Sequence, residues 1–262
     1  MALEPSLWEF LSTLADEACR TWHRPDSGLW EMRTGPRHYT HSKLLCWAAL
    51  DRAVKLARRG LLHGEVPRWE ETAGRIRDAV LREGYDARLG SFVQSFGSRE
   101  LDASCLLIPL QELLPCEDSR VQGTINLILE HLTEEGLVYR YRGDDGLPGE
   151  EGAFGLTTFW LVDALALSGR TEEAERYFEG MARRANHLGL YSEQIEPRTG
   201  AFLGNFPQAF THLGLINSTL YLAHARGVEL PGPPLLGTRA HREADSLPGT
   251  PSRASPGSTS RS

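Results

Sequence analysis

The feature that most constrains the fold is a regular alternation between two kinds of predicted helix. Four segments carry few charges and are apolar nearly all round: residues 40–56, 102–114, 156–168 and 208–225. Between them lie segments with an apolar stripe at helical spacing and charged residues on the other side: 69–83, 119–132 and 171–187. A helix that is apolar on every side is buried, whereas an amphipathic helix has one solvated face. The alternation therefore predicts an inner layer of helices wrapped by an outer layer.

The spacing of the inner helices indicates how the two layers are arranged. They begin near His41, Asp102, Leu156 and Gln208, about 52 to 61 residues apart, which is longer than the roughly 34 residues of a tetratricopeptide repeat. With a further helix predicted over 3–22, the chain supplies about four helical hairpins. We expect an all-α toroid of hairpins. Its Gly-rich loops should converge at one end of the ring, where rigid scaffolds commonly present binding residues.

Composition excludes several classes of protein. The chain has 262 residues, of which 40% are hydrophobic and 24% charged, enough to bury a substantial core. No apolar stretch approaches the roughly 18 to 20 residues of a membrane helix, and Glu4 and Glu9 lie where a secretory signal has basic and apolar residues. We expect a cytoplasmic protein that does not bind membranes. The net charge of −7 without a basic cluster argues against nucleic acid as a partner.

The cysteines give no sign of a metal site or a disulfide framework. Cys19, Cys46, Cys105 and Cys116 form no CxxC pair and lie in apolar helical contexts. Such cysteines usually act as small buried hydrophobic residues. We therefore predict no metal ligands and no cofactor.

Two carboxylate-bearing segments indicate the chemistry. Glu31 lies in DSGLWEMRTGPRHYTHSKLL and Glu193 in GLYSEQIEPRTGAFLGNFPQ, and each segment leads into an apolar helix. Hydrolysis of a glycosidic bond needs one carboxylic acid to protonate the leaving oxygen and one carboxylate to activate or stabilise the attack. These two groups usually come from distant loops. The pair therefore indicates a site that cleaves sugars.

Three segments resemble the catalytic-domain motifs of glycoside hydrolase family 15: WEMRTGPRHYTHSKLLCWAALDRA, GEEGAFGLTTFWLVDAL and SEQIEPRTGAFLGNFPQAFTHLGLIN. The resemblance covers about residues 5–227, with the three motifs in the family's order. The family includes glucoamylases, glucodextranases and bacterial trehalases. The resemblance implies an (α/α)6 barrel that hydrolyses an α-glucoside, such as trehalose or a maltooligosaccharide, with inversion of configuration.

The resemblance also implies roles for individual residues. Glu31 matches the family's general acid and Glu193 its general base, and inversion requires their carboxyl groups to lie roughly 6.5 to 9.5 Å apart with a water between them. We expect the adjacent Trp30 to desolvate Glu31 and so favour its protonated form. Arg140 resembles the arginine that grips a glucose hydroxyl, although Arg142 is an alternative for that role.

Other loop residues are candidates for substrate contacts. Glu151 binds substrate hydroxyls or caps the helix that follows it, and both alternatives stay open. The rings of Trp30 and Tyr191 offer apolar faces to a pyranose, whereas we expect the ring of Phe206 in the core. Asp102 and Asp163 are expected to serve as a helix cap and as a buried hydrogen-bond partner, respectively.

The chain departs from the family pattern in its extent. A closed ring has six hairpins, so about four correspond to the C-terminal two thirds of the catalytic domain, which we assign to residues 1–229. The portion that we expect to precede Met1 includes the family's arginine–aspartate loop for the terminal glucose. An open ring should expose apolar flanks of inner helices. Residues 230–262 are rich in Pro, Gly, Ser and Arg, and we expect a disordered tail there.

Three functions are therefore in competition. The first is an inverting α-glucoside hydrolase of the trehalase or glucoamylase type, whose activity in this truncated chain is in doubt. The second is a non-catalytic carbohydrate-binding or assembly fragment, because half of the glucose pocket is expected to be absent. The third is a helical-hairpin interaction scaffold. A partner chain that covers the open ring is a further expectation.

Overall fold

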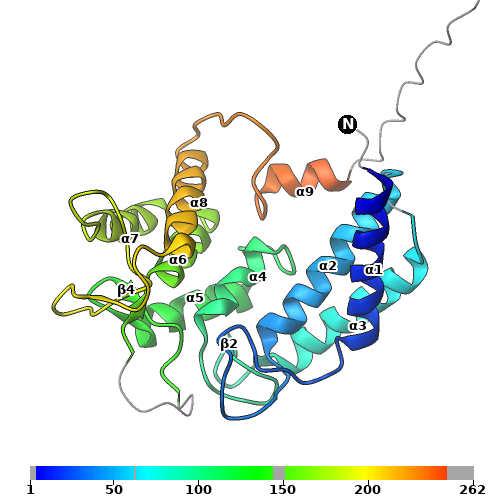
Figure 1. Cartoon of the computed structure of the whole chain (residues 1–262), viewed down its shortest axis with the longest axis horizontal. Helices are drawn as coiled ribbons and strands as arrows, with labels where there is room; N and C mark the ends of the chain where they lie inside the picture. The colour runs from blue at the N-terminus through cyan, green and yellow to red at the C-terminus, as the bar shows by residue number, and fades with distance from the viewer. Residues whose placement is uncertain (1–3, 62, 144–150, 247–262) are drawn as a thin grey trace, which may run out of the picture.

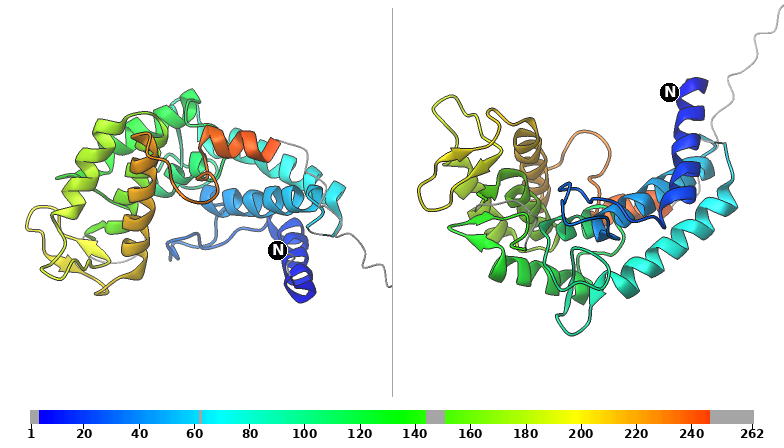
Figure 2. Two further views of the ribbon diagram at one scale, coloured as in Figure 1. Left: turned by 90° about the horizontal axis from the view of Figure 1, so that it is seen from above. Right: turned by 60° about the horizontal axis from the view of Figure 1, so that its bottom comes forward.

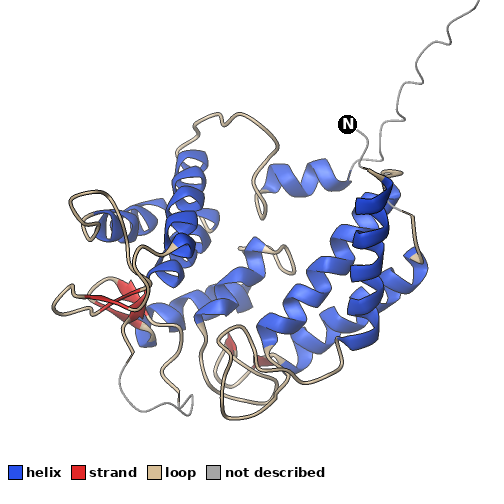
Figure 3. Ribbon diagram, in the orientation of Figure 1, coloured by secondary structure: helices blue, strands red, loops and turns tan. Residues whose placement is uncertain are grey.

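Helices dominate the structure, and the strands are short and confined to the loops between them (Figures 1 and 3). The structure, a computed structural model, describes residues 4–61, 63–143 and 151–246. The longer helices are α1 (Pro5–Thr21), α2 (Thr40–Arg58), α3 (Val66–Glu83), α5 (Ser119–His131), α6 (Gly155–Leu167), α7 (Thr171–Ala182) and α8 (Ala209–Ala225). The shorter ones are the 3₁₀ helix η1 (Ala103–Leu106), α4 (Leu107–Leu110) and α9 (Arg239–Ser246). The predicted all-α class is confirmed.

The helix predicted over 102–114 is the one that differs most from expectation, because it is broken into η1 and α4. Asp102 caps η1 as expected, since its carboxylate accepts a hydrogen bond of 2.7 Å from the Ser104 backbone N–H. Pro109 then removes one backbone donor from the last turn. Glu112 adopts the left-handed conformation, with φ of 68°, which a continuing helix cannot accommodate.

The helices pack in two layers along an arc. α2 packs against α1 and α3, and α6 packs against α7, α8, η1 and α4. Figure 2 shows that the helices follow a curve that does not close on itself. The incomplete toroid of helical hairpins predicted from the sequence is therefore confirmed.

Helix α6 forms the centre of the core. Ten of its 13 residues are buried, and Phe159, Leu161 and Val162 have no exposed surface. It approaches α8 very closely, because a Cβ on Gly214 would lie 2.9 Å from the side chain of Phe159. Asp163 is buried as predicted, and the Ser218 hydroxyl of α8 donates to it at 2.5 Å. None of the described helices is long and apolar enough to cross a membrane.

The ends of the arc expose apolar side chains. On α8, Phe210, Leu213 and Ile216 are 59%, 53% and 56% exposed. On α1, Leu7 and Phe10 are 42% and 57% exposed. The prediction that residues 208–225 are buried all round is thus wrong for one face of α8. The reason is the open ring, which leaves that face without a neighbouring helix among the described residues.

Short antiparallel strands tie the connecting loops together. The strands are β1 (Tyr85–Asp86), β2 (Ser91–Phe92), β3 (Thr133–Glu134), β4 (Leu137–Val138), β5 (Ala153–Phe154), β6 (Gln194–Ile195) and β7 (Phe202–Leu203). β6 lies in the middle of a three-stranded sheet, and its Gln194 pairs with Phe154 of β5 and Leu203 of β7. A single bridge between Tyr39 and Ser95 joins two other loops. These pairings gather the loops that precede the inner helices.

The cysteines behave as expected from the sequence. Cys19, Cys105 and Cys116 are buried, Cys46 is half-buried, and none forms a disulfide. Burial raises the pKa of the Cys116 thiol to about 11 and also raises that of Cys105. These side chains therefore fill the core as small apolar groups.

The region beyond α8 corrects the prediction of a disordered tail over 230–262. Residues 239–246 form helix α9, and Figure 1 shows it crossing from the end of α8 toward α2. Gly237 permits this path because it has φ of +76° and a Cβ there would lie 2.8 Å from the Pro109 carbonyl oxygen. The Tyr221 hydroxyl donates to the Leu236 carbonyl at 3.0 Å. Residues 247–262 of that prediction lie outside the described residues.

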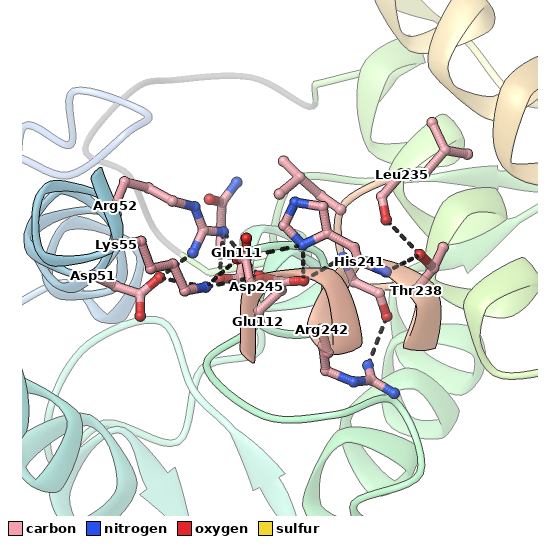
Figure 4. A network of polar contacts seen from close by, with 12 residues as sticks. Asp51, Arg52, Lys55, Gln111, Glu112, Leu235, Thr238, His241, Arg242 and Asp245 are labelled. Atoms are coloured by element: carbon pink, nitrogen blue, oxygen red, sulfur yellow. Dashed lines mark hydrogen bonds and ion pairs between the residues drawn. The ribbon is translucent and has the colours of Figure 1, made fainter. Parts of the chain in front are cut away.

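A network of charges, not an apolar stripe, fixes α9, which is why hydrophobic periodicity did not reveal it (Figure 4). Asp245 pairs with Lys55 of α2 at 2.8 Å and with Arg59, the residue after α2, at 2.6 Å. His241 lies 2.7 Å from Glu112, and Lys55 also lies 3.3 Å from Glu112. Glu112, His241 and Asp245 have ligand atoms within 4.8 Å of one another, but the cations of α2 already balance both carboxylates. We interpret the cluster as an ion-pair network.

We predict that Asp163 makes the protein less stable as the pH rises. Burial raises the pKa of Asp163 to about 8, against the hydrogen bond from Ser218, so the folded state holds a proton that the unfolded chain releases above its usual value of 3.8. Stability is therefore lost as the pH rises from about 4 to 8. Asp163→Asn should remove this loss, worth at most roughly 1.4 kcal/mol per pH unit.

Urea unfolding at several pH values between 4 and 8 measures this effect. Asp118→Asn is a suitable control, because the ion pair with Arg120 lowers the pKa of Asp118 and gives the opposite sign of pH dependence. Equal pH slopes for wild type and Asp163→Asn would contradict the prediction.

We also predict that the ion pairs of Asp245 stabilise the fold by docking α9. Although burial opposes it, the contacts with Lys55, His241 and Arg59 lower the pKa of Asp245, so the contribution is present at neutral pH and is lost as the pH falls through that lowered pKa. Asp245→Ala should cost about 1 to 2 kcal/mol at pH 7. Arg239→Ala, on the exposed side of α9, should cost clearly less, because its pair with Glu243 is open to solvent. Thermal and urea unfolding measure both, and equal losses would refute the assignment.

Candidate active site

Glu31 lies in a tight turn of the loop between α1 and α2. The Asp26 carboxylate organises this turn by accepting hydrogen bonds from the Gly28 backbone N–H at 2.8 Å and the Ser42 hydroxyl at 2.7 Å. Lys43, almost fully buried, donates to the same carboxylate at 3.2 Å. Glu31 itself has φ of 55°, a conformation that residues other than glycine rarely adopt. Its side chain is exposed, so the expectation that Trp30 desolvates it is wrong.

Trp30 instead points its polar edge into the protein. Its indole N–H donates to both oxygens of the Asp102 carboxylate, at 3.1 and 3.0 Å. Its ring packs near Phe154, Trp160 and Tyr141, with centroid distances of 5.6, 6.1 and 6.5 Å. Trp30 is half-buried, so part of it stays accessible beside Glu31.

Arg140 and Glu151 join the same cluster. The Arg140 guanidinium forms an ion pair with Glu151 and lies 5.4 Å from the ring centroid of Trp30 and 5.2 Å from that of Phe154. Its Nε is buried and has no hydrogen-bond partner among the described residues. Helix α6 begins after Phe154, whose side chain makes no capping hydrogen bond, and the ion-pair partner of the Glu151 carboxylate is Arg140.

Arg142, the alternative to Arg140, lies elsewhere. It pairs with Glu134 at 3.2 Å and stacks 4.5 Å from the ring of Tyr139, and its side chain is 49% exposed. Of the two arginines, it is therefore Arg140 that the fold brings to Trp30.

Glu193 lies immediately before β6. Its backbone carbonyl accepts a hydrogen bond of 3.0 Å from the N–H of Gly155, the first residue of α6. Its Oε2 accepts hydrogen bonds from the Asn205 backbone N–H at 3.0 Å and from the Asn205 amide at 2.7 Å. Gly204 is required for this contact, because with φ of +70° it passes so close that a Cβ would lie 2.9 Å from Oε2. The carboxylate is thus held in one orientation.

Two aromatic side chains have the reverse of the exposure that we expected from the sequence. Tyr191 is 2% exposed and packs against Phe159 and His212, with centroid distances of 6.2 and 5.5 Å. The prediction that its ring faces a sugar is wrong, because the residues before β6 turn into the core. Phe206, expected in the core, is 49% exposed and packs on Phe202.

The β5–β6 pairing joins the two carboxylate-bearing loops. Phe154 contacts the Trp30 ring and pairs with Gln194, the residue after Glu193. Trp30, Arg140 and Glu151 therefore lie in one cluster. Glu31 directly follows Trp30, and Glu193 directly precedes Gln194, which pairs with Phe154. Sequence reasoning missed Asn205, and it recognised Asp102 only as a cap. No local pattern could reveal the contact between Asp102 and Trp30, which joins residues 72 positions apart.

Known proteins are similar to this chain in sequence. The chain is 47% identical to a trehalase of Mycobacterium tuberculosis over 223 residues, which is 84% of this chain and 33% of the relative. It is 43% identical to a trehalase of Thermoplasma acidophilum over 211 residues, or 80% of this chain and 36% of that one. The chain thus spans about a third of the length of the curated relatives it matches.

Solved structures show the same fold at low sequence identity. A bacterial glucoamylase in complex with acarbose superimposes with a TM-score of 0.72 at 16% identity, over 91% of this chain and 40% of that chain. A glycosidase variant in complex with glucose gives a TM-score of 0.67 at 24% identity, over 82% and 58%. The family model described as glycosyl hydrolases family 15 matches residues 1–220, which is most of the chain. The chain therefore belongs to glycosyl hydrolase family 15.

Proposed function

We propose that this chain carries the two catalytic carboxylates of an inverting α-glucoside hydrolase, with trehalose as the preferred substrate and maltooligosaccharides as the alternative. The observation that carries the proposal is the link from Glu31 through Trp30, Phe154 and β6 to Glu193. The similarity to the trehalases of Mycobacterium tuberculosis and Thermoplasma acidophilum supports the choice of substrate. The proposal assigns Glu31 as the general acid and Glu193 as the general base.

The hydrogen bonds of Glu193 suit a general base. Both of those that its carboxylate accepts from described residues go to Oε2, from the backbone and side chain of Asn205. Oε1 would then take the proton from the attacking water, while Glu31, in its exposed turn, donates a proton to the leaving oxygen. Neither step requires a metal or a cofactor in this proposal.

The cluster around Arg140 would hold the sugar. Arg140 and Glu151 offer polar atoms for hydroxyl groups, and the accessible part of Trp30 offers an apolar face to the pyranose. The exposed aromatic Phe206, next to Asn205, is a further apolar surface beside Glu193. We withdraw Tyr191 from the substrate-binding set because it is buried.

The open ring favours a second proposal, that this chain is an assembly fragment of a larger catalytic unit. The exposed faces of α8 and α1 carry apolar side chains that a closed ring would bury. We propose that further hairpins, on the same polypeptide or on a partner chain, cover these faces. A cytoplasmic location is part of the proposal and can be tested by cell fractionation.

The geometric prediction is a carboxyl separation of roughly 6.5 to 9.5 Å between Glu31 and Glu193, the range that leaves room for a nucleophilic water. A crystal structure of the protein with a bound glucose-derived inhibitor measures it, with the inhibitor lying between the two groups. Carboxyl groups that face different cavities, or a separation near 5 Å, would contradict inversion.

The activity prediction concerns the extent of the chain. The 262 residues alone should hydrolyse trehalose and maltose barely or not at all. Without the further hairpins the sugar is not held in place, and a misplacement of the reacting groups by about 1 Å can cost on the order of a hundredfold in rate. A form extended at its N-terminus by the hairpins of its relatives should be active. The assay is glucose release, with the anomer followed by NMR. Strong turnover by the 262-residue chain would refute the requirement for further hairpins, and retention of configuration would refute the mechanism.

Substitution of the two carboxylates tests their assignment in the extended form. Glu31→Gln and Glu193→Gln should each lower kcat by about 10²- to 10⁴-fold. Glu135→Gln is a matched control, because Glu135 is also an exposed glutamate in a left-handed turn, with φ of 49°, but lies outside the cluster. A loss in the control as large as that in Glu31→Gln would show that the effect is structural.

A further inference from the structure

A buried carboxylate, that of Asp102, lies behind Trp30. Asp102 is 2% exposed, and none of the ion pairs between described residues includes it. It accepts hydrogen bonds from the Trp30 indole, from the Gln94 amide at 3.2 Å and from the Ser104 backbone N–H at 2.7 Å. A buried carboxylate is costly and persists only where such donors satisfy it.

Capping of η1 does not account for this arrangement. Asp118 caps α5 in the same way, by accepting from the Arg120 backbone N–H at 2.9 Å, and it is also paired with the Arg120 side chain. No tryptophan is needed for such a cap. The Trp30 indole N–H donates to both oxygens of the Asp102 carboxylate. This contact is therefore a feature of the structure that the capping role does not explain.

The same segment holds the other side of the aromatic cluster. The backbone N–H of Ala103, next to Asp102, donates to the Arg140 carbonyl at 2.9 Å. The Arg140 guanidinium in turn lies 5.4 Å from the Trp30 ring. Residues 102 and 103 thus fix the positions of Trp30 and Arg140 relative to each other.

Glu31 follows Trp30 directly and has a strained backbone. A left-handed conformation at a residue other than glycine persists only when the surrounding structure determines it. On one side, Met32 is buried and its N–H donates to the Ser27 carbonyl at 2.8 Å. On the other side, Trp30 is held by the rings packed around it and by the hydrogen bonds of its indole N–H to Asp102. The turn is therefore held at both ends.

We infer that Asp102 is a positioning residue for the acid of the proposed reaction: by holding the Trp30 indole it keeps Glu31 in its left-handed turn, directed away from the core. The inference rests on the proposed function for the role of Glu31 as the acid. The contact between Asp102 and the Trp30 indole does not depend on that proposal. It assigns Asp102 a part in the active site although it lies 72 residues from Trp30 and is almost fully buried.

NMR of the 262-residue chain tests the contact and the turn without any assay of activity. Trp30→Phe assigns the Trp30 indole resonance among those of the six tryptophans. In Asp102→Ala the Trp30 indole N–H should lose its protection from exchange, and the Glu31 backbone resonances should move toward random-coil positions. Asp102→Asn retains an oxygen acceptor and should preserve most of both signals. Asp118→Ala, which removes a cap without touching Trp30, should leave both unchanged.

Kinetics of the extended form test the consequence. Asp102→Ala should lower kcat by about 10- to 100-fold with a smaller change in KM, and Asp102→Asn should recover most of the loss. Asp118→Ala should leave kcat unchanged. If Glu31→Gln abolishes activity but Asp102→Ala does not lower kcat, the inference fails while the proposed function stands. If Glu31→Gln has no effect on activity, the proposed function fails. Unchanged Glu31 resonances in the NMR spectrum of Asp102→Ala would by themselves overturn the inference.

Discussion

Burial of α6 on every side is the constraint on which the rest of the structure depends. A helix with ten buried residues out of 13 must be surrounded, and α7, α8, η1 and α4 all pack against it. Close approach is possible because Gly155 and Gly214 carry no Cβ: one at Gly155 would lie 2.6 Å from the Thr211 side chain, and one at Gly214 would lie 2.9 Å from Phe159. The Ser218 hydroxyl then joins Asp163 and the Phe159 carbonyl across the two helices. The starts of α6 and α8 are thereby fixed, and so are the loops that precede them.

Those loops owe their precision to backbone pairing more than to side-chain packing. The N–H of Gly155 donates to the Glu193 carbonyl, and β5, β6 and β7 form one small sheet. A proposed base next to the central strand of a sheet is more rigid than one on a free loop, and Asn205 adds a second restraint on its carboxylate. The turn of Glu31 depends on Asp26 at one side, where a bridge with Arg37 closes the loop, and on Trp30 at the other.

Away from these loops, electrostatics replaces hydrophobic packing. α9 has few apolar side chains to bury. It docks on α2 through Asp245 and on Glu112, which lies just after α4, through His241. The segment lies beyond residue 220, where the family match ends. It contacts Lys55, Arg59 and Glu112, whereas the apolar faces of α1 and α8 stay exposed.

The sequence by itself determined the helices, their order and their layers, because hydrophobic periodicity is a local property that survives in any arrangement of the elements. The motif resemblance identified Glu31, Glu193 and Arg140 as candidates. Only the tertiary structure decided which residues meet. It turned Tyr191 inward, exposed Phe206, paired Arg140 with Glu151 and placed Asp102 behind Trp30. It also ordered residues 239–246, since the ion pairs that hold α9 come from α2, nearly 190 residues earlier in the chain. Contacts of this kind depend on how distant segments are brought together, which no window of sequence contains.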